Sequence, residues 1–169
     1  MSRYARQIIL PEVGEEGQER LSAAHALVSG AGGLGAPVIQ YLAGAGVGRM
    51  TIVDDDLVDE TNLHRQTLFQ MEDLDQEKAE AAVRFVRRLN PDISAFPVAM
   101  GLDPANAEMM AKGATIVLDC ADSFAVSYTL SDVCLRLGKP LISASALQLS
   151  GYVGGFCGGA PSLRAVFPD

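Results

Sequence analysis

"HALVSGAGGLGAPVIQYLAGAGVG", residues 25–48, is the stretch that decides the fold of this 169-residue chain. Its opening HALVS has the length and apolar character of a buried strand. The run GAGGLG then fits the pattern G-x-G-x-x-G, whose glycines allow a tight turn between a strand and a helix. A helix is expected next, with Pro37 in its first turn, where the missing N–H costs little. This order predicts the first strand–turn–helix unit of an α/β sheet.

The remainder of the chain continues this alternation. Apolar runs predict further strands at residues 49–54, 92–100, 114–121, 139–146 and 149–159, and helical periodicity predicts helices at 15–24, 75–90, 104–112 and 123–138. Because the inner strands are apolar almost throughout, helices should cover both faces of the sheet. The predicted fold is a doubly wound, Rossmann-like, mostly parallel α/β sheet in one domain over residues 1–169.

Composition excludes several classes of protein. The chain is 49% hydrophobic and 20% charged, which excludes disorder, and its formal net charge of −8 argues against nucleic acid as a partner. Residues 26–48 carry no charge, but their glycines and Pro37 argue against a membrane span. Three cysteines without a C-x-x-C pair are typical of reduced thiols, so a cytoplasmic location is expected.

The glycine turn by itself favours a dinucleotide. Asp54 ends the second predicted strand about 20 residues after the turn, which is the position of a ribose-binding acid in NAD enzymes. An NAD-dependent oxidoreductase is therefore one interpretation of these two features. A structural glycine turn without any ligand is another.

The polar segment after that strand favours a triphosphate instead. Arg65 is a planar cation whose donors suit phosphate oxygens, and Asn62 and Gln66 add uncharged donors. Lys78 lies in the first turn of the next helix, where the helix dipole disfavours a cation, so a ligand is a plausible partner for it. NAD binding needs neither cation, so the pair favours a triphosphate. Taken alone, Lys78 could equally well be a lysine on a solvated helix face.

Asp122 follows the fourth predicted strand, at the same edge of the sheet. It could cap the next helix, or it could be a ligand of Mg²⁺, which prefers one or two carboxylates together with phosphate oxygens. Neither His25 nor His64 has metal-ligand spacing, and Cys157 has no activating base nearby in sequence, so structural roles are expected for all three.

The combination of these motifs resembles a known family. The runs RYARQIILPEVGEEGQERL (3–21), GAGGLG (30–35), TIVDDDLVDETNLHRQTL (51–68) and VLDCADS (117–123), together with the helix bearing Lys78, resemble the ubiquitin-activating-type adenylyltransferases, and most closely the bacterial ThiF/MoeB/HesA proteins. The resemblance implies a cytoplasmic homodimer that uses ATP and Mg²⁺. It implies that the enzyme activates the C-terminal Gly-Gly carboxylate of a small ubiquitin-like sulfur-carrier protein of the thiamin or molybdopterin pathway, forming an acyl-adenylate and pyrophosphate.

The resemblance also implies roles for individual residues. The nucleotide would be bound by Gly30, Gly32, Gly33, Gly35, Asp54, Asp56, Thr61, Asn62 and Gln66. Arg65 and Lys78 would bind the triphosphate, and Asp122 would hold Mg²⁺. Arg6 would cross a dimer interface into the ATP site of the neighbouring subunit.

Two departures from the family pattern change the expectations. Relatives carry a C-x-x-C pair where this chain has Ser162 and Ala165, so no zinc site is expected. Relatives also continue beyond the position of Asp169 with a second cysteine pair, so the chain is expected to be a fragment. A catalytically degenerate binding partner with the same fold is therefore a further alternative.

Overall fold

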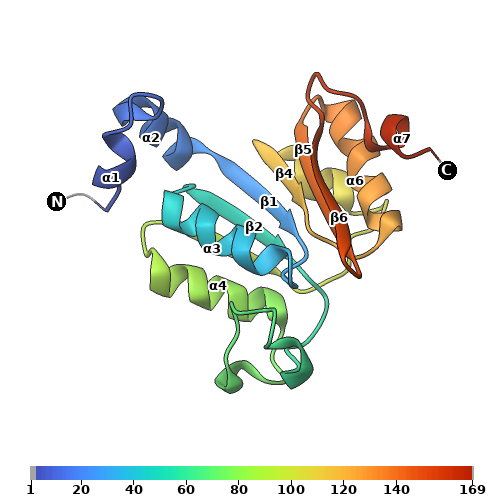
Figure 1. Ribbon diagram of the computed structural model, residues 1–169, viewed down its shortest axis with the longest axis horizontal. Helices are drawn as coiled ribbons and strands as arrows, with labels where there is room; N and C mark the ends of the chain where they lie inside the picture. The colour runs from blue at the N-terminus through green and yellow to red at the C-terminus, as the bar shows by residue number, and fades with distance from the viewer. Residues whose placement is uncertain (1–2, 169) are drawn as a thin grey trace.

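The computed structural model describes residues 3–168 and contains one six-stranded sheet in the order β3-β2-β1-β4-β5-β6 (Figure 1). The strands are β1 (His25–Ser29), β2 (Arg49–Val53), β3 (Ser94–Val98), β4 (Ile116–Asp119), β5 (Pro140–Leu147) and β6 (Ser150–Cys157). The first five run parallel, and β6 is antiparallel to β5. The connection from Leu147 to Ser150 is too short for a crossover, so it can only form a hairpin. The predicted doubly wound, mostly parallel sheet is confirmed.

Helices lie on both faces of this sheet. The main ones are α3 (Gly35–Ala45), α4 (Lys78–Leu89), α5 (Ala107–Lys112) and α6 (Phe124–Leu137). Shorter elements are α1 (Ala5–Ile8), α2 (Gly14–Ala23), α7 (Leu163–Val166) and the 3₁₀ turns η1 (Glu60–Asn62) and η2 (Met71–Asp73). The sequence did not predict α1, α7, η1 or η2, because each is too short to show a helical period.

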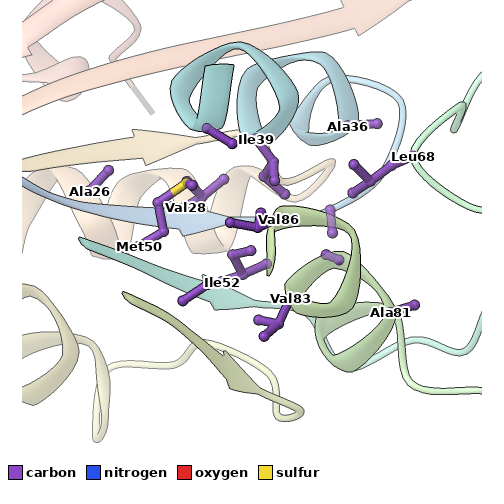
Figure 2. Packing of buried hydrophobic residues seen from close by; sticks show 14 of the residues in the cluster. Ala26, Val28, Ala36, Ile39, Met50, Ile52, Leu68, Ala81, Val83 and Val86 are labelled. Atoms are coloured by element: carbon purple, nitrogen blue, oxygen red, sulfur yellow. The ribbon is translucent and has the colours of Figure 1, made fainter. Parts of the chain in front are cut away.

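Two apolar layers form the core, one on each face of the sheet. In the first layer, Val28 and Ile52 of the strands pack with Ile39 of α3 and Val83 of α4 (Figure 2). In the second, Leu27 is buried on the other face among residues of α5 and α6. Both faces of β1 are therefore buried, which explains why its three central residues, Ala26 to Val28, are all apolar.

The stretch considered as a membrane span is divided between β1, the glycine turn and α3. No helix within residues 3–168 is long and apolar enough to cross a membrane. Helix α3 ends at Ala45, and Gly46 follows in the left-handed conformation with φ +84°. This is the helix stop that glycine provides most easily.

Candidate functional site

The glycine turn packs its backbone so closely that side chains cannot be added. A Cβ atom at Gly35 would lie 1.9 Å from the carbonyl oxygen of Gly30. Gly30 has φ +91°, and a Cβ there would lie 2.7 Å from the carbonyl oxygen of Cys120. The turn therefore lies directly on the end of β4 and presents the amino end of α3, where free N–H groups favour an anion.

Asp54, the residue after β2, lies beside the glycine turn and binds it. Its Oδ2 accepts the N–H of Ala31 at 2.7 Å, and its Oδ1 accepts the N–H of Asp56 at 3.0 Å. Burial raises the pKa of Asp54, and these two N–H donors oppose that rise. The carboxylate is thus held in one orientation beside the glycine turn.

Two side chains of the polar segment lie over the turn. A Cβ at Gly33 would lie 3.5 Å from both Cγ and Cδ of Arg65, and a Cβ at Gly32 would lie 3.6 Å from Nε2 of Gln66. Arg65 and Gln66 both donate to Oδ1 of Asn62, at 2.9 and 3.1 Å. Asn62 therefore orients the two donors above the glycines, more than 25 positions away in sequence.

Gln66 carries an unpaired polar atom at this place. The residue is only 3% exposed, and its Oε1 is a buried oxygen without a hydrogen-bond partner among residues 3–168. Leaving such an acceptor unpaired costs about 1–3 kcal/mol. The site therefore contains a buried acceptor, beside the glycine turn, that a ligand donor could satisfy.

Lys78 has a partner within the chain. Its Nζ lies 2.7 Å from Oδ2 of Asp56, and its backbone N–H donates to the carbonyl oxygen of Asp56 at 2.9 Å. The lysine side chain is 5% exposed, which excludes the interpretation of Lys78 as a solvated surface lysine, while that of Asp56 is 69% exposed. The ammonium also acts on Asp54, where it lowers the pKa against the larger effect of burial. The ion pair with Asp56 thus compensates the Lys78 cation for its unfavourable position at a helix start.

Thr61 lies in the same segment, but its polar groups are engaged by a neighbour. Its backbone N–H donates to Oδ1 of Asp59 at 2.7 Å, and its hydroxyl donates to the same oxygen. Asp59 is the residue that precedes η1, so this pair shapes the turn that carries Asn62.

Asp122 is exposed in the turn between β4 and α6. The N-cap residue of α6 is Ser123, and its side chain forms no cap bond within residues 3–168. Asp122 directly precedes this N-cap position. The backbone of Cys120 and Ala121 contacts Gly30. Asp122 is the next residue along the chain and so follows directly after this contact with the glycine turn.

A buried acid near the site that the sequence alone did not single out is Asp119, the last residue of β4. Its side chain is completely buried, its Oδ2 accepts the hydroxyl of Ser143 at 2.7 Å, and its Oδ1 accepts the N–H of Ala121 at 3.3 Å. Burial raises the pKa of this carboxyl. The signal that could have identified Asp119 is an acid at the end of an otherwise apolar strand. Through its bond to the N–H of Ala121, Asp119 fixes the turn that leads to Asp122.

Arg6 is the one predicted site residue that the fold places far from the others. Residues on either side of it dock at the carboxyl end of α3: the ring of Tyr4 lies against Gly46, and Nε2 of Gln7 donates to the carbonyl oxygen of Ala45 at 2.8 Å. The glycine turn lies at the opposite end of this 11-residue helix, about 16 Å away. Figure 1 shows α1 next to α2, which leads into the amino end of β1.

His25 and Cys157 have structural surroundings, whereas His64 is exposed with its Nδ1 3.0 Å from the carbonyl oxygen of Thr61. His25 contacts the carbonyl oxygen of Gly113 through Nδ1 at 3.0 Å and the hydroxyl of Thr51 through Nε2 at 2.9 Å. The thiol of Cys157 is buried, donates to the carbonyl oxygen of Ser131 at 3.4 Å, and has a pKa raised by burial. Among residues 3–168, no group of three or more His, Cys, Asp or Glu side chains could hold a metal ion by itself.

Ser162 and Ala165, the positions from which no zinc site is expected, lie at α7. The hydroxyl of Ser162 accepts the N–H of Ala165 at 3.3 Å and so caps this helix. Leu163 between them is fully buried, and its N–H donates to the hydroxyl of Ser131 at 2.9 Å. The ring of Phe167 lies 4.9 Å from that of Tyr152. Packing and a serine cap therefore hold the segment in this structure.

Comparison with known proteins identifies similar chains. The ThiF family pattern matches residues 4–169. The chain is 44% identical over 169 residues to a SAMP-activating enzyme E1 of Haloferax volcanii, covering 100% of this chain and 63% of that protein. It is 47% identical over 167 residues to the adenylyltransferase and sulfurtransferase UBA4 of Yarrowia lipolytica, covering 98% of this chain and 42% of that one. The chain thus spans less than two thirds of the length of these relatives.

Solved structures agree in fold. E. coli MccB with MccA-N7isoASN superposes with a TM-score of 0.84 at 27% identity, over 94% of this chain and 48% of that chain. The E. coli tRNA N6-threonylcarbamoyladenosine dehydratase TcdA, in complex with ATP, superposes with a TM-score of 0.78 at 30% identity, over 83% of this chain and 58% of that one.

Proposed function

Because this chain belongs to the ThiF family, we propose that it is the nucleotide-binding part of an ATP-dependent adenylyltransferase. Its substrate is the C-terminal Gly-Gly carboxylate of a small ubiquitin-like sulfur-carrier protein, and its products are an acyl-adenylate and pyrophosphate. The observation that carries this proposal is the placement of the Arg65 side chain over Gly33 and of Gln66, whose Oε1 is buried and unpaired, beside Gly32. The names of the relatives and the ATP complex of TcdA support it.

Different side chains bind different parts of the nucleotide. Asp54 accepts the ribose hydroxyls, as its fixed carboxylate beside the turn allows. Arg65 and Lys78 bind the phosphates, and Lys78 can do so while keeping Asp56, because an ammonium has three donors and this carboxylate takes one. The net charge of −8 makes these local cations necessary for a polyanionic ligand and argues against a nucleic-acid substrate.

The reaction needs no nucleophile from the described chain. A carboxylate oxygen of the carrier attacks the α-phosphorus of ATP, the bond from that phosphorus to the bridging oxygen breaks, and the electron pair leaves on pyrophosphate. The protein aligns the reactants and stabilises the charge that develops on the leaving group. The thiols fit this absence of a nucleophilic role, since burial raises the pKa of Cys120 and Cys134 to about 12. Buried, unpaired thiols also accord with the cytoplasmic location that belongs to this proposal.

Mg²⁺ fits the site through Asp122. This exposed carboxylate next to the glycine turn provides the single acid that Mg²⁺ commonly takes from protein beside phosphate oxygens. The bound ion would neutralise phosphate charge. Asp119 supports this role by fixing the N–H of Ala121, the residue before Asp122.

A homodimer completes the site. Arg6 belongs to a segment that docks at the carboxyl end of α3, about 16 Å along that helix from the glycine turn of its own chain, so it serves the phosphates of a second copy. Helix α3, which runs between these two points, has an open apolar groove of about 460 Å³ lined by Pro37, Val38, Tyr41, Leu42, Ala45 and Leu118. Tyr41 is 76% exposed there. We assign this groove to the contact with the second copy, because a twofold contact along α3 presents each Arg6 toward the other chain.

The direct test is carrier-dependent exchange between ATP and pyrophosphate in the full-length protein. Exchange is expected with a carrier that ends in Gly-Gly and is expected to be lost when that Gly-Gly is removed. Binding of NAD without binding of ATP would instead support the oxidoreductase. Binding of ATP without exchange, for every candidate carrier of the organism, would support the degenerate binding partner.

The shared site has its own test. Arg6→Ala and Lys78→Ala subunits should each be inactive alone, but a mixed dimer contains one site with both residues intact. Mixing them should restore part of the exchange. Verified mixed dimers without recovery would refute the contribution of Arg6 across the interface.

A further inference from the structure

The segment that carries Arg6 cannot hold its own shape. Helix α1 has 4 residues, and none of them is buried. A helix this short is not stable alone, because nucleation costs more than one turn returns. Arg6 itself is exposed and forms no ion pair within residues 3–168. Its position therefore depends on how the residues beside it are attached.

One attachment precedes Arg6. Asn90, which is 0% exposed at the end of α4, donates through Nδ2 to the hydroxyl of Tyr4 at 2.7 Å and to the carbonyl oxygen of Ala43 at 2.9 Å. The ring of Tyr4 fills the space beside Gly46, where a Cβ would lie 2.5 Å from the ring. Only glycine at position 46 leaves room for this ring.

A second attachment follows Arg6. Nε2 of Gln7 donates to the carbonyl oxygen of Ala45 at 2.8 Å and to Oε1 of Gln18. Nε2 of Gln18 donates to the same carbonyl oxygen at 3.2 Å, and Gln18 is only 8% exposed. Gln7 and Gln18 thus both donate to the last carbonyl oxygen of α3, and Gln7 attaches the chain after Arg6 to the end of that helix.

We propose that Tyr4, Gly46, Asn90, Gln7 and Gln18 form a latch that positions Arg6 for the ATP site of the second copy. This inference rests on the proposed function, because it assumes that Arg6 acts across the dimer. The latch fixes the chain immediately before and after Arg6 on the carboxyl end of α3. The same helix begins at the glycine turn, so the latch sets the place of Arg6 relative to the helix that runs along the interface.

Mixed dimers test the latch with one working site. The donor subunit carries Lys78→Ala, so its own site is inactive and it supplies only Arg6. The acceptor subunit carries Arg6→Ala and contains the intact site. Gly46→Ala in the donor displaces the ring of Tyr4, and exchange should fall by about tenfold to 100-fold, as for a small misplacement of a reacting group. In the acceptor, the same change should have little effect on exchange, because that subunit donates no Arg6.

A matched control separates the latch from backbone strain. Gly138 ends α6 with φ +63°, and a Cβ added there would meet no atom of residues 3–168 within 4 Å. Gly138→Ala therefore introduces left-handed strain without touching Tyr4, and it should leave exchange unchanged in either subunit. Tyr4→Phe removes only the hydroxyl that Asn90 contacts, and in the donor it should lower kcat while the KM for ATP stays the same.

Each outcome of the mixed-dimer experiment supports or overturns the latch. An equal loss from Gly46→Ala in donor and acceptor would show a general defect of the fold and overturn the latch. An unchanged rate with the donor variant would also overturn it, while the shared site would stand. If the parent mixture itself were inactive, the shared site would fail and the latch with it.

Discussion

At the scale of the single residue, Lys78 organises the charge of the site. A lysine whose side chain is 5% exposed needs a partner, and Asp56 supplies it from the loop after β2. Arg65 differs, because it is exposed and is oriented by Asn62 above Gly33. One cation is therefore held in place by burial and the other by a hydrogen bond, before any nucleotide is bound.

We expect Arg65→Ala and Lys78→Ala to lower carrier-dependent exchange by at least about 100-fold each, as for loss of one donor to a developing anion. Arg20→Ala is the control, because Arg20 pairs with Glu16 on the surface of α2 and lies outside the site. Rates close to that of the unmodified protein in either site variant would contradict the assigned roles.

Gln66 allows affinity and stability to be separated. Gln66→Met keeps the size of the side chain but removes the unpaired oxygen together with the bond to Asn62. The unfolding free energy should change by no more than about 1 kcal/mol, since the lost bond is offset by the relief of a buried acceptor. ATP binding, measured by calorimetry, should weaken by about tenfold. Reduced stability with unchanged affinity would assign Gln66 a purely structural role.

Asp119 should make stability depend on pH. Burial raises its pKa above the ordinary 3.8, so the folded state keeps the proton to higher pH than the unfolded state does. Stability should therefore fall as the pH rises from 3.8 through the raised pKa. Asp119→Asn cannot lose a proton, so its stability relative to the unmodified protein should increase over that range. Urea unfolding at several pH values measures this difference, and parallel curves would contradict it.

At the scale of the element, side-chain packing and a serine cap hold α7. Ser162 caps the helix, Leu163 is buried, and Arg164 pairs with Asp132 at 3.0 Å while lying over the ring of Tyr128. None of these contacts uses a thiolate. A serine hydroxyl stays protonated near neutral pH and is a poor zinc ligand, whereas alanine offers no ligand.

We therefore expect the purified, untagged protein to hold far less than one zinc ion per chain, and its unfolding temperature to be the same with and without a chelator. Leu163→Ala should lower the unfolding free energy by about 2–5 kcal/mol, because it leaves a cavity in the second core layer. About one tightly bound zinc per chain, with unfolding on chelation, would show this expectation to be wrong.

At the scale of the whole molecule, α3 connects two functions. In the proposed function its amino end meets the nucleotide and its carboxyl end holds the latch, and its exposed face forms the apolar groove. A change in the middle of this helix should thus separate the copies without touching the nucleotide site directly.

Tyr41→Glu places a charge in that groove and should convert the dimer to monomers, as sedimentation would show. Exchange should be lost with it, because Arg6 no longer reaches a second copy. Met109→Glu is the matched control, since Met109 is 74% exposed on α5 and is not part of the groove. A dimer that persists in the Tyr41→Glu variant would refute the assignment of the groove.

The parts of this structure that could be predicted are those with a local signature. The glycine turn, the strand before Asp54 and the helix that begins at Lys78 follow from periodicity and turn chemistry over short windows. The bond between Tyr4 and Asn90 joins residues 86 positions apart, and no local pattern contains it. The same is true of Asp56 as the partner of Lys78, which depends on how the loop folds back on the helix.

The buried thiols have a practical consequence for anyone who handles the protein. All three cysteines are buried, and burial raises the pKa of each, so thiolate is scarce in the folded state. An alkylating reagent such as iodoacetamide should react slowly until the domain opens. The rate of alkylation under native conditions would then report the frequency of opening, with no probe added to the chain.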